Sequence, residues 1–145
     1  MPAKFYPLAF LIPVVFLFTT NRWLPWKEAH DLVQASDVST SYEPIALASP
    51  SFPQEKLFTH QAQRFVLPYL IGGGAKLLHV PMETAYRLAS LLLVAAILTQ
   101  VFLALGNGPG ALLGFSLFVL NPYALRYYLV APGMAPDLFF IFAVA

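Results

Sequence analysis

Long apolar segments alternate with one polar segment along this chain, and the charged residues mark the boundaries between them. Residues 5–21 and residues 88–125 contain no Asp, Glu, Lys or Arg. Nine of the charged residues lie instead between Arg22 and Arg64. A membrane crossing needs about 20 apolar residues. The pattern therefore predicts a helical membrane protein with a polar loop over residues 22–62.

The first apolar segment predicts a transmembrane helix over residues 5–21. Its alternative is the apolar core of a secretory signal, with Lys4 preceding it. No small-x-small cleavage pattern follows, since the flank reads FTTNRW, and this favours an uncleaved anchor. Trp23 and Trp26, just beyond the helix, are typical of the membrane interface.

The charge-free run of 38 residues at 88–125 is long enough for two crossings, and the tetrapeptide NGPG at 107–110 divides it. Asn-Gly and Pro-Gly are strong turn signals. We therefore expect one transmembrane helix over residues 83–106 and another over residues 110–131.

Residues 63–80 allow two interpretations. The segment is apolar, but it contains three consecutive glycines at 72–74 and a lysine, Lys76. Each glycine costs about 1 kcal/mol inside a helix, and a lysine deep in a crossing costs roughly 2.5–3.5 kcal/mol. A broken helix lying in the membrane interface is therefore favoured over a full crossing.

The last apolar segment, residues 136–145, contains only eight residues after Asp137. Eight helical residues extend about 12 Å, whereas the hydrocarbon core is about 30 Å thick. We therefore expect a partial transmembrane helix, and a chain that is a truncated fragment of a longer protein. The predicted fold class is all-α integral membrane. It has about four transmembrane helices, the last one truncated, a polar first loop and an interfacial juxtamembrane helix.

Composition supports the membrane class and excludes several others. The chain is 59% hydrophobic and 10% charged, whereas soluble domains are about 25% charged. A net charge of +1 gives no electrostatic reason to expect nucleic-acid binding. The absence of cysteine excludes disulfides, thiolate metal sites and cysteine nucleophiles.

Two stretches of sequence place carboxylates where chemistry could occur. Asp37 and Glu43 flank VSTSY in the polar loop, where a partly desolvated carboxylate can act as a general base or a metal ligand. The simpler alternative is a solvated loop that caps a short helix starting near Tyr42. Asp137 follows APGMAP and is either a helix cap or an acid facing a cavity.

Arg64 and Arg87 each precede an apolar run. Their side chains either reach towards the interface or bind a phosphate through charge-assisted hydrogen bonds. His30, Asp31 and His60 have no recognised metal-ligand spacing, so no metal site is predicted from the residues.

Three stretches, taken in order, resemble the amino-terminal part of the GT-C superfamily, and mannosyltransferase-like members in particular. These are integral-membrane glycosyltransferases that use polyprenyl-phosphate-linked sugars. The stretches are DVSTSYEPIALA, RFVLPYLIGGGAKLLHVPMETAYRLASLLLVAAILTQVFLALG and ALLGFSLFVLNPYALRYYLVAPGMAPDLFFIFAVA. They are similar, respectively, to the family's acidic loop, to its juxtamembrane helix with the next crossing, and to a further crossing followed by an Asp that opens the fourth.

The resemblance implies transfer of a sugar from a polyprenyl-phosphate donor to an extracytoplasmic acceptor. Loop 22–62 would then face the extracytoplasmic side of the inner or plasma membrane. The candidate catalytic acids are Asp37, which matches best, Glu43 and Asp137. The candidate substrate-binding residues are Arg64, Arg87 and Tyr42. A divalent metal is a candidate cofactor, and the partners are the lipid bilayer and the donor.

A non-catalytic membrane protein, such as a transporter fragment or an assembly subunit, is the alternative. Transporters often place acids or broken helices near the middle of the membrane. The acids of this chain lie at a helix end and in a loop, which favours the enzyme. Counting Lys and Arg in the flanking loops leaves the orientation open.

Overall fold

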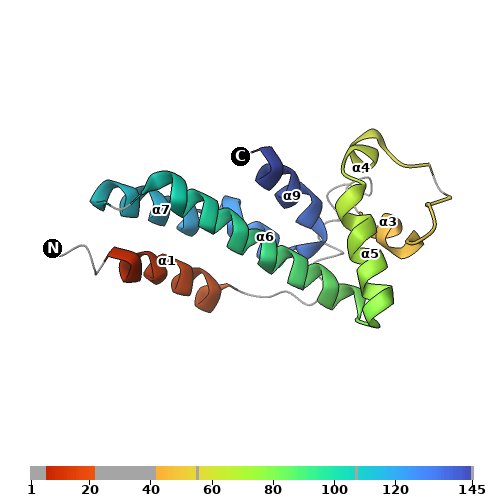
Figure 1. Ribbon diagram of the computed structural model, residues 1–145, viewed down its shortest axis with the longest axis horizontal. Helices are drawn as coiled ribbons and strands as arrows, with labels where there is room; N and C mark the ends of the chain where they lie inside the picture. Colours follow the sequence, from red (N-terminus) through yellow and green to blue (C-terminus); the bar gives the residue numbers. More distant parts are fainter. Residues whose placement is uncertain (1–5, 22–41, 55, 107, 145) are drawn as a thin grey trace.

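The computed structural model describes residues 6–21, 42–54, 56–106 and 108–144, and all regular structure in these ranges is helical. The predicted all-α class is thereby confirmed for the described residues. Asp37, the first candidate acid, lies outside them. Figure 1 shows the longest helix, α6, running along the molecule, with a smaller group of helices, α3, α4 and α5, gathered at one end.

Helix α6 spans Met82–Leu105 and matches the helix predicted over residues 83–106. Glu83 in its first turn favours the helix dipole, and Gly106, with φ of 71°, follows its last residue. Its 24 residues extend about 36 Å. By length and composition, α6 is the one helix in the described part of the chain that could cross a membrane. The further crossings stay a prediction.

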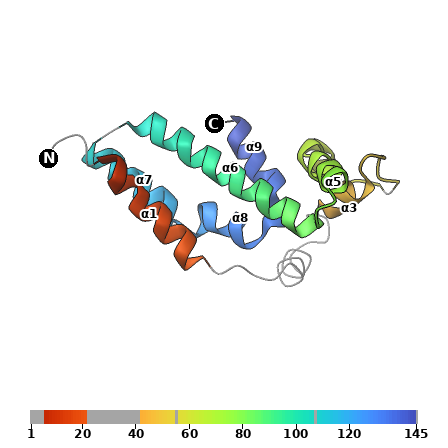
Figure 2. The same cartoon turned by 60° about the horizontal axis from the view of Figure 1, so that its bottom comes forward.

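Two helices pack beside α6 to form the main apolar core. Helix α1, Tyr6–Thr20, lies alongside α7, Pro109–Leu120, in both Figure 1 and Figure 2. The Phe10 ring meets Phe102 at 5.0 Å and Phe115 at 5.2 Å between centroids, both edge to face. The buried members of this core are Phe10, Leu17, Val94, Ile97, Leu98, Phe115, Val119, Leu125, Leu129 and Leu138.

The single helix expected over residues 110–131 is interrupted. Helix α7 ends at Leu120 and is followed by a π-helical turn, η3, over Pro122–Arg126, and a short helix, α8, over Tyr127–Val130. Pro122 supplies no N–H to the preceding turn. The residue before a proline is pushed out of the helical region, and Asn121 is accordingly extended, with ψ of 118°.

Two further elements complete the bundle. A 3₁₀ turn, η4, spans Pro132–Met134 and leads into helix α9, Ala135–Val144. Helix α9 packs against α6 and also touches α5. It therefore joins the main core to the group of helices at the other end.

Part of the polar loop is helical. Helix α3 spans Glu43–Ala48 and helix α4 spans Thr59–Gln63. The start of α3 directly after Tyr42 confirms the predicted short helix there. The expected capping is wrong, because the N-cap residue is Tyr42 and its side chain makes no capping hydrogen bond. The segment is not solvated throughout, because Ile45 and Tyr42 are buried.

Helix α5, Val66–Leu78, continues without a break through its three glycines, contrary to the broken helix expected for residues 63–80. A Cβ on Gly72 would lie 2.0 Å from the carbonyl oxygen of Ala46 in α3. Glycine is therefore needed there for the two helices to approach so closely. The 13 residues of α5 extend about 20 Å, which is shorter than a crossing.

A second apolar cluster joins the α3–α5 group to the bundle. Its buried members are Ala46 from α3, Ile71 from α5, Tyr86 from α6 and Ala135 from α9. Ala135 and Leu138 belong to different clusters although both lie near the start of α9. The first turn of α9 thus lies where the two clusters meet, and this position brings Asp137 to the polar loop.

Candidate functional site

Three segments that are distant in the sequence meet at Tyr42, Arg64 and Asp137. Tyr42 immediately precedes α3, Arg64 follows α4, and Asp137 lies in the first turn of α9. Arg64 and Asp137 are 73 residues apart, and Tyr42 and Asp137 are 95 residues apart. We call these three residues the polar cluster.

The polar cluster is closed by three contacts. The Arg64 Nη1 group forms an ion pair with Oδ1 of Asp137 and donates a hydrogen bond of 3.1 Å to the Tyr42 hydroxyl. That hydroxyl donates in turn to Oδ1 of Asp137 at 3.1 Å. A hydroxyl can accept one hydrogen bond and donate another, so Tyr42 satisfies the arginine and the carboxylate together.

Burial sets the protonation of the cluster. Tyr42 is 1% exposed, and this burial raises the pKa of its phenol, to which Asp137 also contributes. The phenol therefore stays neutral and keeps its proton for Asp137 at neutral pH. The hydrogen bond to Tyr42 raises the pKa of Arg64 above its ordinary value, so the guanidinium stays charged. The side chains of Arg64 and Asp137 are 33% and 17% exposed, so solvent reaches both.

The contacts leave part of each charged group available. Both hydrogen bonds to Asp137 fall on Oδ1, and its Oδ2 accepts none from the described residues. Arg64 uses Nη1 alone, so its Nη2 and Nε have no hydrogen-bond acceptor within the described part of the chain. A guanidinium has five N–H donors. The cluster thus presents a carboxylate oxygen and several cationic donors side by side.

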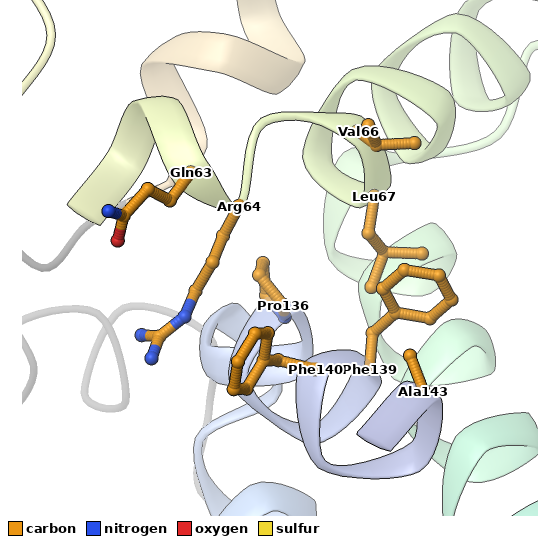
Figure 3. Close-up of a pocket in the computed structure, with 8 residues that line it drawn as sticks. All are labelled: Gln63, Arg64, Val66, Leu67, Pro136, Phe139, Phe140 and Ala143. Atoms are coloured by element: carbon orange, nitrogen blue, oxygen red, sulfur yellow. The ribbon is translucent and has the colours of Figure 1, made fainter. Parts of the chain in front are cut away.

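An apolar cavity of about 100 Å³ adjoins Arg64. Figure 3 shows Val66 and Leu67 of α5 facing Phe139 and Ala143 of α9 across it, with the guanidinium directed away from them. An apolar cavity of about 150 Å³ can hold benzene, so this one has room for a few carbon atoms. The remaining lining residues are Gln63, Arg64, Pro136 and Phe140.

Phe140 is a member of the site that the sequence did not indicate. The Arg64 guanidinium carbon lies 5.4 Å from the centre of its ring, within cation–π distance. Asp137 and Phe140 are three residues apart on α9 and therefore share a face. That spacing was visible in the sequence, but nothing showed that this face meets Arg64.

The three other predicted site residues, Arg87, Glu43 and Asp37, are not members of the polar cluster. Arg87 pairs with Glu83 at 2.7 Å, four residues earlier on α6, and is not among the contacts of the polar cluster. Glu43 lies in the first turn of α3, next to Tyr42. Asp37 lies outside the described residues.

Asp137 does not have the helix-capping position that was one expectation. It is the third residue of α9, inside the first turn, and its carboxylate contacts Arg64 and Tyr42. A negative charge there still favours the helix dipole. Its main partners, however, come from other elements.

The described residues do not fit a divalent metal. Within them, no group of three or more His, Asp or Glu side chains could hold a metal ion. Asp137 is the single carboxylate of the polar cluster, and the Arg64 guanidinium beside it opposes a second cation there.

We expect the Tyr42→Phe variant to lose less stability than the wild type as the pH rises into the alkaline range. A raised phenol pKa stabilises the fold below the unfolded pKa of about 10, and this stability is lost as pH rises through the higher folded pKa. Melting temperatures of both proteins in detergent, measured from about pH 8 to about pH 11, should therefore fall more steeply for the wild type. Parallel curves for the two proteins would contradict the buried phenol.

No protein-family model matches this chain, and neither a curated protein nor a solved structure matches it.

Proposed function

We propose that this chain forms part of a GT-C-like integral-membrane glycosyltransferase, which moves a sugar from a polyprenyl-phosphate donor to an extracytoplasmic acceptor. The observation that carries the proposal is the polar cluster, with its available donors on Arg64 and its available oxygen on Asp137, beside an apolar cavity. A lipid phosphate needs both a cationic and an apolar neighbour, and both occur here.

Arg64 is the residue best placed to hold the donor phosphate. Its Nη2 and Nε groups have no hydrogen-bond acceptor among the described residues, and guanidinium groups bind phosphate by paired hydrogen bonds. Carbon atoms next to the phosphate would enter the cavity between Leu67 and Phe139. Arg87, whose guanidinium pairs with Glu83 on α6, remains a candidate for a second contact with the phosphate.

A carboxylate would receive the proton released in the transfer. The acceptor hydroxyl oxygen bonds to the anomeric carbon while the bond from that carbon to the phosphate oxygen breaks. The electron pair leaves with the polyprenyl phosphate. The hydroxyl proton passes to Asp37, or to Glu43, which begins α3. Asp137 supports the reaction as a second acid in the polar cluster, where the Tyr42 hydroxyl donates a hydrogen bond to it. It is not among the residues that line the cavity.

The test measures sugar transfer in membranes containing the complete protein. Asp37→Asn and Asp137→Asn should each lower transfer from radiolabelled polyprenyl-phosphate mannose or glucose about 100-fold or more, with expression unchanged. Gln54→Ala, at an exposed position that is not part of the polar cluster, serves as the control. Unchanged transfer in both acidic variants would overturn the assignment of these acids.

The proposed function also requires the polar loop to face a particular side of the membrane. Loop 22–62 should face the extracytoplasmic side of the inner or plasma membrane, because the acceptor is outside. The chain contains no cysteine, so a single cysteine at Gln54 should react with a membrane-impermeant maleimide added to intact cells. Labelling only after the cells are opened would place this segment in the cytoplasm and count against the enzyme.

A non-catalytic membrane protein is the second candidate, and one observation favours it. Asp137 is ion-paired with Arg64 rather than presented alone, as expected of a contact that fastens α9 to the α3–α5 group. On this alternative, Asp137→Ala lowers thermal stability, while neither the variant nor the wild-type protein transfers any sugar.

A further inference from the structure

Asn21 is a buried polar residue whose side chain lacks a partner in the described part of the chain. It directly follows α1 and is 7% exposed. Neither its amide nitrogen nor its amide oxygen forms a hydrogen bond with the described residues. Buried polar groups without hydrogen bonds are rare in native proteins. A ligand that carries both an acceptor oxygen and a hydroxyl would satisfy the two atoms together.

The residue before Asn21 holds a cation that lacks an anionic partner among the described residues. Thr20 accepts a hydrogen bond from Nη2 of Arg126, which ends the π-helical turn η3. The Thr20 hydroxyl donates in turn to the Phe16 carbonyl oxygen at 2.6 Å. A guanidinium has five N–H donors, and no carboxylate of the described residues pairs with Arg126. The remaining donors of Arg126 are therefore available to an anion.

An exposed apolar series on α1 leads to Arg126. Leu8, Ile12 and Phe16 are 60%, 69% and 52% exposed. They are spaced four residues apart, so they follow one another along one side of the helix. Thr20, the next position in this series, is the residue that contacts Arg126. From Leu8 to Thr20 the series extends about 18 Å, so an acyl chain lying along it would have its headgroup at Arg126.

The surroundings of Arg126 suit a lipid headgroup. Tyr127, the next residue, is 39% exposed, and tyrosine is enriched at the membrane interface. The carboxyl end of α1 contributes a partial negative charge of about half an electron, which the full charge of Arg126 exceeds. The last carbonyl oxygens of a helix have no partner within it, so those of α1 can accept hydrogen bonds from headgroup hydroxyls.

We propose that Thr20, Asn21 and Arg126 bind the headgroup of a phosphatidylglycerol-type phospholipid, with one acyl chain along the exposed apolar series of α1. The lipid phosphate accepts hydrogen bonds from Arg126 and from the Asn21 amide nitrogen, and a glycerol hydroxyl donates to the Asn21 amide oxygen. Asn21 lies beyond the last helical residue of α1, so its side chain can turn towards Thr20 and the lipid. The proposal depends on the chain lying in a membrane and is independent of any sugar transfer.

Melting temperatures of the complete protein in detergent, with defined lipids added, test the site. Phosphatidylglycerol at about 100 times its Kd should raise the melting temperature by about 5 °C. Phosphatidic acid, which has the phosphate without the glycerol hydroxyls, should raise it less. Phosphatidylcholine, which has neither a net charge nor a headgroup hydroxyl, should leave it unchanged. Equal shifts with all three lipids, or equal shifts with phosphatidylglycerol and phosphatidic acid, would overturn the proposal.

Two variants test the residues of the site. Arg126→Gln should weaken phosphatidylglycerol binding about 10-fold or more. Lys56→Gln, which removes the same charge at an exposed position, should not. Asn21→Leu should weaken binding as well, yet without lipid it should be at least as stable as the wild type, because it removes an unpaired buried amide.

Two results would contradict this assignment of residues. If Arg126→Gln lowers the melting temperature equally with and without phosphatidylglycerol, Arg126 only stabilises the carboxyl end of α1, and the proposal fails. If Asn21→Leu binds phosphatidylglycerol as well as the wild type does, the unpaired amide of Asn21 is not part of a lipid site.

Discussion

Gly72→Ala should destabilise the protein, whereas Gly74→Ala should not. The added methyl group would lie 2.0 Å from the Ala46 carbonyl oxygen, and 2.6 Å and 2.7 Å from two more backbone atoms of that residue. Backbone cannot move aside as a flexible side chain can, so α3 and α5 must separate. Overpacking of this kind costs about 1–3 kcal/mol, which corresponds to roughly 2–12 °C in melting temperature.

The three consecutive glycines provide matched controls for this prediction. A Cβ on Gly73 would meet only the Ser49 hydroxyl oxygen, at 3.0 Å, and a Cβ on Gly74 would meet nothing within 4 Å. Gly73→Ala should therefore be close to neutral, and Gly74→Ala should stabilise α5 by up to about 1 kcal/mol through helix propensity. Melting temperatures of the three variants in one detergent check the order. Equal values at Gly72 and Gly74 would contradict the close approach of α3 and α5.

The second large effect is expected for Asp137→Ala. Tyr42 is buried, and its hydroxyl donates a hydrogen bond to the Asp137 carboxylate. Removing the acceptor of a buried donor costs about 1–3 kcal/mol. Arg64 also loses its ion pair, but it is 33% exposed and can turn to water, so we assign this loss no more than about 1 kcal/mol. We expect a total loss of about 1–4 kcal/mol.

Asp137→Asn is the matched control, because asparagine retains an oxygen that accepts the Tyr42 hydrogen bond. It should cost about 1 kcal/mol or less. Tyr42→Phe combined with Asp137→Ala should cost less than the sum of the two single changes, with a coupling of about 1–2 kcal/mol. Unfolding free energies of the four proteins complete the cycle. If alanine and asparagine have the same effect at 137, the buried hydroxyl is not the source of the loss.

The sequence predicted the elements that local pattern determines. The charge-free run and the NGPG turn place the end of α6 within a residue of its position, because helix ends depend on nearby glycine and proline. The break after Leu120 carried a signal too, Asn121 followed by Pro122. This signal does not by itself predict a break, because membrane helices often tolerate proline.

The polar cluster could be predicted only in part. Tyr42, Arg64 and Asp137 were each candidates, but Arg64 and Asp137 were assigned separate roles. Their pairing depends on α9 packing against α5, a contact between segments 73 residues apart that no local spacing specifies. From the sequence alone, Gly72 only weakens a helix over residues 63–80. Its role becomes visible only when Ala46, its partner on α3, is known.

The distance along the chain between Arg64 and Asp137 sets an order of events during synthesis. Ribosomes add about 5–20 residues per second, so the 73 residues that separate the pair take about 4–15 s to make. During that interval Tyr42 and Arg64 have left the ribosome before their carboxylate exists. Until α9 is made and closes the cluster, the segments that carry Tyr42 and Arg64 therefore lack this carboxylate, and the guanidinium is hydrated or paired with another anion.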